Sequence, residues 1–139
     1  MVDDVLLNKA AIIERCLKRI DEEYRGHERD FHGNFTRQDS IILNLLRACE
    51  ASIDLAMHLV RSRRLGLPQE SREAFTLLEQ AGLLNDALAA RMRAMIGFRN
   101  IAVHDYQKLN LDIVESILQK HINDFRSFTA VALRSEGNS

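Results

Sequence analysis

The sequence predicts an all-α protein, an up-and-down four-helix bundle with one additional short helix. Apolar residues recur every three or four positions along most of the 139 residues, which is the period of helices buried on one side. One proline, six glycines and no tryptophan favour helices over a turn-rich β architecture. Long amphipathic segments joined by short loops pack as a bundle. We therefore expect a single helical domain at 1–135 and a disordered tail at 136–139.

The first predicted helix covers residues 2 to about 24, where apolar side chains recur at helical spacing. From Arg25 to Arg37 the pattern breaks at two glycines among many charges, which predicts a flexible charged loop. Four side chains in this loop belong to the types that bind metals: His27, Glu28, Asp30 and His32. Because no second ligand cluster matches them in the sequence, the loop is the better interpretation and no metal site is predicted.

The second predicted helix runs from residue 38 or 39 to 64, with Asp39 as its N-cap. Gly66-Leu67-Pro68 ends it. A short helix then begins, capped by Ser71, and Gly82 follows its end in the C′ position.

Two more helices complete the predicted bundle, from residue 85 or 86 to His104 and from about 111 to 134. Cys16 and Cys49 both fall on apolar helical faces, which predicts buried, reduced thiols. Asp54 lies one turn before His58 and is interpreted as its partner on the same helix.

Charge gives no overall case for binding nucleic acid, since nineteen basic and twenty acidic side chains leave a net charge of −1. Binding to nucleic acid would therefore need a local basic patch. Two clusters could supply one, or could be solvated helix faces: Arg61, Arg63 and Arg64, and Arg91, Arg93 and Arg99. The amino terminus lacks the features of a secretory signal and no apolar run reaches membrane-spanning length, so a cytoplasmic location without membrane contact is expected.

The segment from Arg99 to Tyr106 is the most informative, because it sets side chains suited to phosphodiester chemistry near the end of an apolar helix. Asn100 and His104 are four residues apart and share a helix face. The long stem of Arg99 can bring its guanidinium to a phosphate beside them. Histidine can exchange a proton near neutral pH. In the alternative interpretation, Arg99 covers the bundle surface with its stem and His104 is a helix-end histidine favoured by the macrodipole.

The run R-N-x-x-x-H-D-Y resembles the R-polar-x-x-x-H motif of the HEPN superfamily of ribonucleases, and more narrowly the R-x-x-x-x-H-x-Y form of the HepT toxins. The order of a helix containing Asn44 and His58, a short helix ending at Gly82, and the motif helix is also similar to the HepT layout. The resemblance covers nearly the whole chain and implies a HEPN-like bundle.

HepT-like proteins are the toxins of HEPN/MNT toxin-antitoxin pairs, dimeric metal-independent RNases that a minimal nucleotidyltransferase inhibits. The resemblance implies that Arg99 and His104 are the catalytic pair, that Asn100 is the polar residue after the arginine, and that Tyr106 carries the hydroxyl that the antitoxin adenylylates. It also implies three partners: an RNA substrate, a second copy of the chain and the cognate MNT nucleotidyltransferase antitoxin. Neither a metal nor another cofactor is implied.

A dimer is also expected from the chemistry. Cleavage by attack of a 2′-hydroxyl needs a proton acceptor, a proton donor and positive charge near the phosphorane. One chain offers one motif histidine, whereas a two-fold axis would bring two His104 and two Arg99 together. Gly97, which is unfavourable inside a helix, is interpreted as permitting close approach of another helix, such as one from a second subunit.

Two alternatives remain at this stage. The chain could be a non-catalytic helical partner or substrate-binding subunit of a minimal nucleotidyltransferase, which needs Arg99 as a phosphate ligand but no proton transfer by His104. It could also be a structural helical dimer, which needs neither residue.

Overall fold

The computed structural model describes residues 3–137, which form six α-helices and two short 3₁₀ helices without a strand. In chain order they are α1 (Asp4–Tyr24), η1 (Glu28–Gly33), α2 (Phe35–Ser62), α3 (Ser71–Gln80), α4 (Asp86–His104), η2 (Tyr106–Lys108), α5 (Leu111–Lys120) and α6 (Ile122–Gly137). The predicted all-α fold is confirmed.

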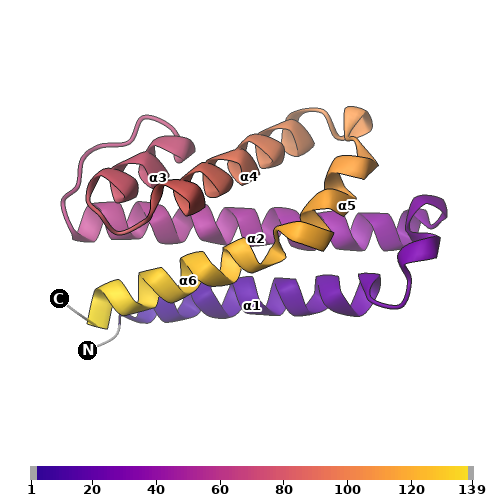
Figure 1. Ribbon diagram of the computed structural model, residues 1–139, viewed down its shortest axis with the longest axis horizontal. Coiled ribbons are helices and arrows are strands. Elements are labelled where there is room, and N and C mark those ends of the chain that lie inside the picture. Colours follow the sequence, from indigo (N-terminus) through magenta and orange to yellow (C-terminus); the bar gives the residue numbers. More distant parts are fainter. Residues whose placement is uncertain (1–2, 138–139) are drawn as a thin grey trace.

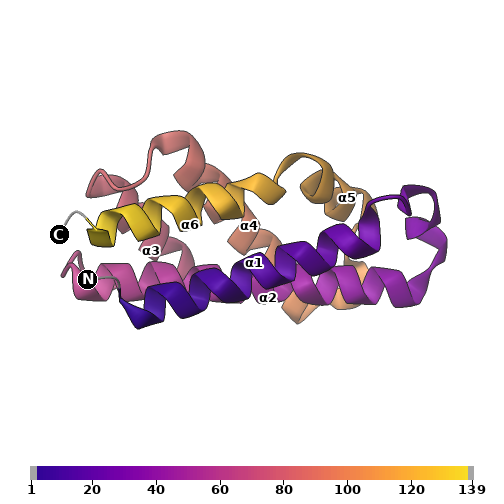
Figure 2. The same cartoon turned by 90° about the horizontal axis from the view of Figure 1, so that it is seen from below.

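The two longest helices, α1 and α2, form an antiparallel pair, and the other helices pack around it (Figure 1). Helices α3 and α4 lie along one side of α2, while α6 contacts α1, α2 and α4 (Figures 1 and 2). The core is continuous across these layers; the rings of Phe75 in α3 and Phe128 in α6, for example, are 5.2 Å apart. Cys16 and Cys49 are buried free thiols, as predicted.

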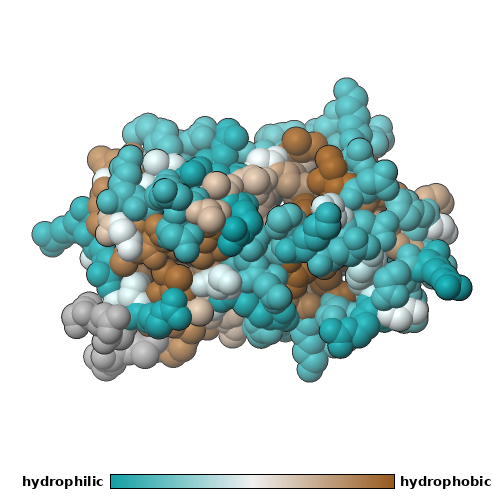
Figure 3. Space-filling view, in the orientation of Figure 1, coloured by the Kyte–Doolittle hydropathy of each residue, from teal (hydrophilic) through white to brown (hydrophobic). Residues whose placement is uncertain are grey.

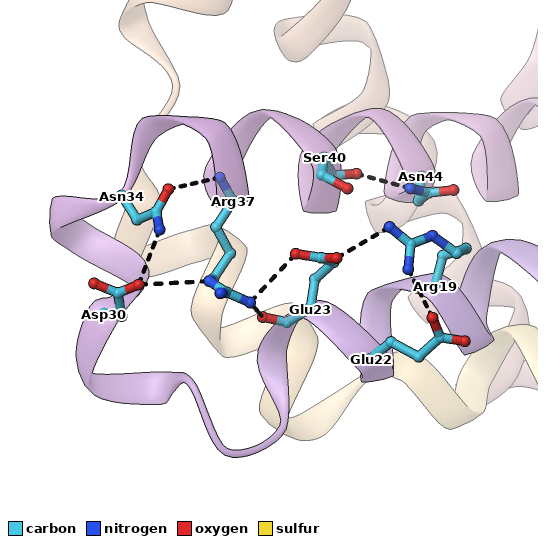
Figure 4. Close-up of polar contacts among 8 residues, drawn as sticks. All are labelled: Arg19, Glu22, Glu23, Asp30, Asn34, Arg37, Ser40 and Asn44. Atoms are coloured by element: carbon cyan, nitrogen blue, oxygen red, sulfur yellow. Dashed lines mark hydrogen bonds and ion pairs between the residues drawn. The ribbon is translucent and has the colours of Figure 1, made fainter.

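Helix α2 begins at Phe35, several residues before its predicted start, and Asp39 is not its N-cap. Asn34 takes that position, because its side-chain oxygen accepts from the backbone N–H of Arg37. Figure 4 shows the guanidinium of Arg37 held between Glu23 of α1 and Asp30 of η1. The predicted loop is therefore partly ordered as η1, and this polar network fixes where α2 starts.

The boundaries around α3 and α4 agree more closely with the prediction. Helix α3 begins at Ser71, but Glu70 occupies the N-cap position and makes no side-chain capping bond. Gly82 follows α3 with a φ of 78°, a left-handed conformation that favours glycine, as its predicted C′ position requires. Asn85 caps α4 through a 2.8 Å bond from the Leu88 N–H.

The single helix predicted at about 111–134 is wrong, because the chain breaks at His121 into α5 and α6. Both helices bury apolar residues against the same bundle, so the periodicity continues across the break and does not reveal it. Helix α6 extends through Glu136 to Gly137, where the tail was predicted to begin. Residues 138–139, like residue 2 in the predicted first helix, lie outside the described residues.

The predicted pair of Asp54 and His58 is also wrong. Asp54 pairs instead with Lys9 of α1 at 3.0 Å. His58 Nε2 lies 2.6 Å from a carboxylate oxygen of Asp3, just before α1. Contacts between neighbouring helices thus replace the contact within α2. No helix in residues 3–137 is long and apolar enough to cross a membrane.

Candidate active site

Helix α4 holds the motif, and its buried side anchors the motif residues to the bundle. Leu88, Met92, Met95, Ile96 and Ala102 are buried at helical spacing. Because these anchors continue to within two residues of His104, the polar end of α4 is fixed in place by the core. The motif therefore lies at the rim of a packed bundle, on a rigid element.

Arg99 is held by two neighbours. Its guanidinium is paired with the carboxylate of Glu50, which comes from α2. Its Nη1 donates to the amide oxygen of Asn100 at 2.9 Å. A single orientation of the Asn100 amide follows, in which the oxygen faces Arg99 and the amide N–H₂ is left to donate to another group.

His104 is the last residue of α4 and is exposed. No hydrogen bond joins its imidazole to another of the described residues, so both ring nitrogens are accessible to a substrate. Asn100 lies one turn earlier, as predicted from the spacing. The chain then leaves the helix at Asp105, whose backbone N–H still bonds to the Ile101 carbonyl at 2.8 Å.

Tyr106 opens η2 and contacts a residue far away in the sequence. Its hydroxyl donates to Oδ1 of Asp39 in α2 at 2.6 Å. Partial burial, together with this bond to a carboxylate, raises the pKa of Tyr106 to about 12. The phenol is therefore neutral at physiological pH.

A groove of about 440 Å³ lies beside the Tyr106 hydroxyl. It is mixed in chemistry and is lined by residues of α2, η2 and the start of α5: Phe35, Gln38, Asp39, Ile42, Tyr106, Gln107, Leu109 and Leu111. Figure 3 shows hydrophobic surface where α4, η2 and α5 meet. Tyr106 and Asp39 thus both line a concave region with space for a ligand.

The outward face of α4 is made of small and apolar residues. At alternating spacings of three and four residues, this face contains Ala87, Ala90, Ala94, Gly97 and Ile101. Ile101 is 57% exposed. A Cβ added at Gly97 would meet no atom within 4 Å, so no other helix within residues 3–137 approaches it closely. Packing between helices within residues 3–137 therefore does not require a glycine at position 97.

Most arginines of the two predicted clusters are already paired. Besides Arg99, three are held by other residues: Arg63 by the carbonyl oxygen of Ser135, Arg91 by Asp124 and Arg93 by Glu79. Sequence reasoning did not identify a different basic groove of about 480 Å³ between α1 and α2. Arg15 and Arg47 line it, and neither forms an ion pair with another described residue. Glu50, the partner of Arg99, lines it too.

One group of described residues could hold a metal ion, and it contains none of the motif residues. His32, Asp112 and Glu115 bring their ligand atoms within 4.8 Å of one another. In the structure, His32 Nε2 lies 2.5 Å from a Glu115 oxygen, so the imidazole is already used in linking η1 to α5. His27, Glu28 and Asp30, the other residues considered as ligands, do not join this group.

Comparison with known sequences identifies the family. The family described as "Ribonuclease HepT-like" matches residues 13–132. The chain belongs to this HepT-like ribonuclease family. A curated relative, the mRNA nuclease HepT of Shewanella oneidensis, is 52% identical over 130 residues, which cover 94% of this chain and 97% of the relative.

Solved structures of similar sequence have the same fold as this chain. The tri-AMPylated Shewanella oneidensis HEPN toxin in complex with MNT antitoxin superposes with a TM-score of 0.88 at 52% identity, covering 93% of this chain and 96% of that one. A toxin-antitoxin complex with AMP-PNP gives the same TM-score at 50% identity, with 94% and 98% covered. The predicted HEPN-like fold is thereby confirmed.

The structure brings the predicted site residues of this HepT-like protein into one region at the end of α4 and in η2. It adds two acidic residues of α2 that sequence reasoning missed, Glu50 beside Arg99 and Asp39 beside Tyr106. Asp39 was assigned to capping because it stood near the expected start of α2. No local sequence signal links either acid to the motif, since helix packing makes both contacts.

Proposed function

We propose that this chain is the toxin of a HEPN/MNT toxin-antitoxin pair, a metal-independent endoribonuclease that acts on RNA in the cytoplasm. The observation that carries the proposal is the motif of Arg99, Asn100 and His104 at the exposed end of α4, in a HepT-like chain 52% identical to an mRNA nuclease. Arg99 and His104 are the proposed catalytic pair.

In the proposed reaction a ribose 2′-hydroxyl attacks the adjacent phosphorus, and the bond from phosphorus to the 5′-oxygen breaks. One His104 removes the proton from the 2′-hydroxyl and a second His104 protonates the leaving 5′-oxygen. Arg99 stabilises the charge that develops on the phosphorane, and the Asn100 amide N–H₂ donates to one of its oxygens. The incoming phosphate competes with the Glu50 carboxylate for Arg99.

The second His104 would come from a second copy of the chain. The unpartnered, small-residue face of α4 around Gly97 supports this dimer, because small side chains let two helices approach closely. This face runs along α4 from Ala87 to Ile101, and His104 follows three residues later. If two chains paired along the face, their two motifs would lie near the two-fold axis.

RNA would reach the motif along the groove that Arg15 and Arg47 line. Their unpaired guanidinium groups are suited to phosphates of a single strand. Glu50 lines this groove and also contacts Arg99, so the groove ends beside the proposed catalytic arginine.

Neutralisation would occur by AMPylation of Tyr106. The exposed hydroxyl two residues after His104 supports this assignment, together with the solved relative that is a tri-AMPylated toxin bound to its MNT antitoxin. AMP attached there would bring a phosphate and a nucleotide close to Arg99 and His104, where they would exclude RNA.

Cleavage of total RNA by the purified, unmodified chain in the presence of chelator tests the proposal. We expect cleavage by the parent chain and none by His104→Ala. If folded parent protein leaves RNA intact, the result would favour the second function, a non-catalytic partner of a nucleotidyltransferase that keeps Arg99 as a phosphate ligand.

A further inference from the structure

The contact between Tyr106 and Asp39 joins two elements 67 residues apart, and the motif does not explain it. Asp39 lies in the second turn of α2, and Asn34 supplies the capping bond at the start of that helix. Its carboxylate is exposed and forms no ion pair with another described residue. The carboxylate is therefore free for another role, and its contact is the Tyr106 hydroxyl.

The bond also sets the direction of the hydroxyl proton. A carboxylate can only accept, so the single O–H of Tyr106 points at Asp39 Oδ1. The lone pairs of the phenolic oxygen then face away from Asp39 and are available for attack. The groove that Tyr106 and Asp39 both line gives a reacting nucleotide room to approach.

We propose that Asp39 of the toxin is the proton acceptor for AMP transfer to Tyr106, an inference that rests on the proposed AMPylation of this residue. The antitoxin would supply the nucleotide and its binding site, whereas the toxin would supply both the nucleophile and its base.

The step is balanced with ATP as the co-reactant. The Tyr106 oxygen attacks the α-phosphorus, and a new bond from oxygen to phosphorus forms. The bond between the α-phosphorus and the oxygen bridging to the β-phosphate breaks, and pyrophosphate leaves with its electron pair. The phenolic proton passes to Asp39 Oδ1 and then to solvent.

An aspartate suits this role although it is a weak base. Its side chain is ionised at neutral pH, so it is always ready to accept the proton as the new bond forms. Protein kinases use an aspartate in the same way, to accept the proton of a substrate hydroxyl that attacks a phosphoryl group. Asp39 already lies at the 2.6 Å that such a transfer needs.

The experiment measures the rate of AMP incorporation into the full chain by intact-mass spectrometry. The probe is ATP with Mg²⁺ and the MNT antitoxin of the Shewanella oneidensis HEPN toxin, at saturating concentrations. Asp39→Asn keeps the shape of the side chain and removes its basicity. We expect its rate constant to fall about 100-fold or more. Asp39→Glu, which retains a carboxylate, is expected to recover part of that loss.

Asp105→Asn is the matched control, because it removes the same charge next to Tyr106 from a residue that does not contact the phenol. It should react like the parent. Thermal unfolding confirms that each variant is folded. An Asp39→Asn rate within threefold of the parent would overturn the inference. So would an effect that appears only in a titration at lower antitoxin concentrations and disappears at saturation, which would assign Asp39 to docking.

AMP incorporation into the parent chain tests the proposed AMPylation separately from the role of Asp39. Absence of AMP on parent protein, or AMP on Tyr106→Phe at the parent level, would contradict the proposed modification of Tyr106 and the inference with it. Transfer to the parent at Tyr106 with an unaffected Asp39→Asn would contradict only the role of Asp39.

Discussion

Helices α1 and α4 differ in what they present to solvent. The outward side of α1 contains charged residues such as Glu14 and Lys18, as expected for a helix on the surface of a bundle. The outward side of α4 instead contains Ala90, Ala94 and Ile101. An exposed apolar stripe on a helix is typical of a surface that another element or another protein covers. The packing of one chain accounts for the surface of α1, whereas it leaves this apolar stripe of α4 exposed.

Helices α1 and α4 also differ in how their polar side chains are bonded. Lys9 of α1 pairs with Asp54 of the neighbouring helix α2. The polar end of α4 presents an unbonded imidazole at His104 and an amide N–H₂ at Asn100. Unused polar groups on a rigid helix indicate chemistry with a substrate rather than stabilisation of the fold.

The sharpest test of this difference is His104→Ala. Because a dimer would lose both its acid and its base, we expect RNA cleavage to fall at least about 1,000-fold. The thermal midpoint should change little, since the imidazole bonds to no other described residue. His27→Ala removes another exposed histidine and serves as the control; equal cleavage by the two variants would contradict a catalytic His104.

Gly97→Leu tests whether the outward face of α4 holds a second subunit. Leucine fits the open space in one chain and favours the helix by about 1 kcal/mol, so the folded monomer should tolerate it. At a close dimer contact it would separate the subunits and lower cleavage about 100-fold through loss of one histidine. Light scattering after gel filtration gives the oligomeric state.

Ala11→Leu places the same side chain on the exposed surface of α1 and should change neither mass nor activity. A Gly97→Leu protein with unchanged oligomeric state and activity would remove the role proposed for Gly97.

A smaller effect is expected for Arg47→Ala in the basic groove. Loss of one phosphate contact should weaken binding of single-stranded RNA about fivefold and reduce the slope of log K against log salt by about 0.7. Fluorescence anisotropy with His104→Ala as the common background avoids cleavage during the titration. Arg25→Ala, at an arginine outside this groove, should keep the parent slope; an equal loss there would indicate only a general charge effect.

The smallest effect is expected at the contact between Asp3 and His58, which lies outside the motif. The bond from His58 holds the pKa of Asp3 below its usual value near 3.8. A carboxyl group whose pKa is lower in the folded than in the unfolded protein stabilises the fold at pH values above the unfolded-state pKa. This stabilisation is lost as the pH falls through the folded-state pKa. Asp3→Asn should therefore lower the thermal midpoint slightly at pH 7, and the difference should shrink as the pH falls below the usual carboxyl pKa near 3.8. Cleavage at pH 7 should stay unchanged.

Sequence reasoning anticipated the elements whose signals are local. The bounds of the motif helix and the Gly82 turn depend on spacing and on residues beside the helix ends, so both were predictable. The α2 start was not, because Asn34 is stabilised there by the network that joins Arg37 to Glu23 and Asp30. The break at His121 was hidden by an apolar period that both adjoining helices share.

For the site, the sequence by itself determined where the motif lies and that Asn100 and His104 share one helix face, because that relation follows from the helical repeat. Only the tertiary structure decided that Arg99 lies against Glu50 and that Tyr106 donates to Asp39. These contacts join residues 49 and 67 positions apart. Their geometry depends on how α2 packs beside α4 and η2, and the periodicity of a single helix contains no information about a neighbour's position.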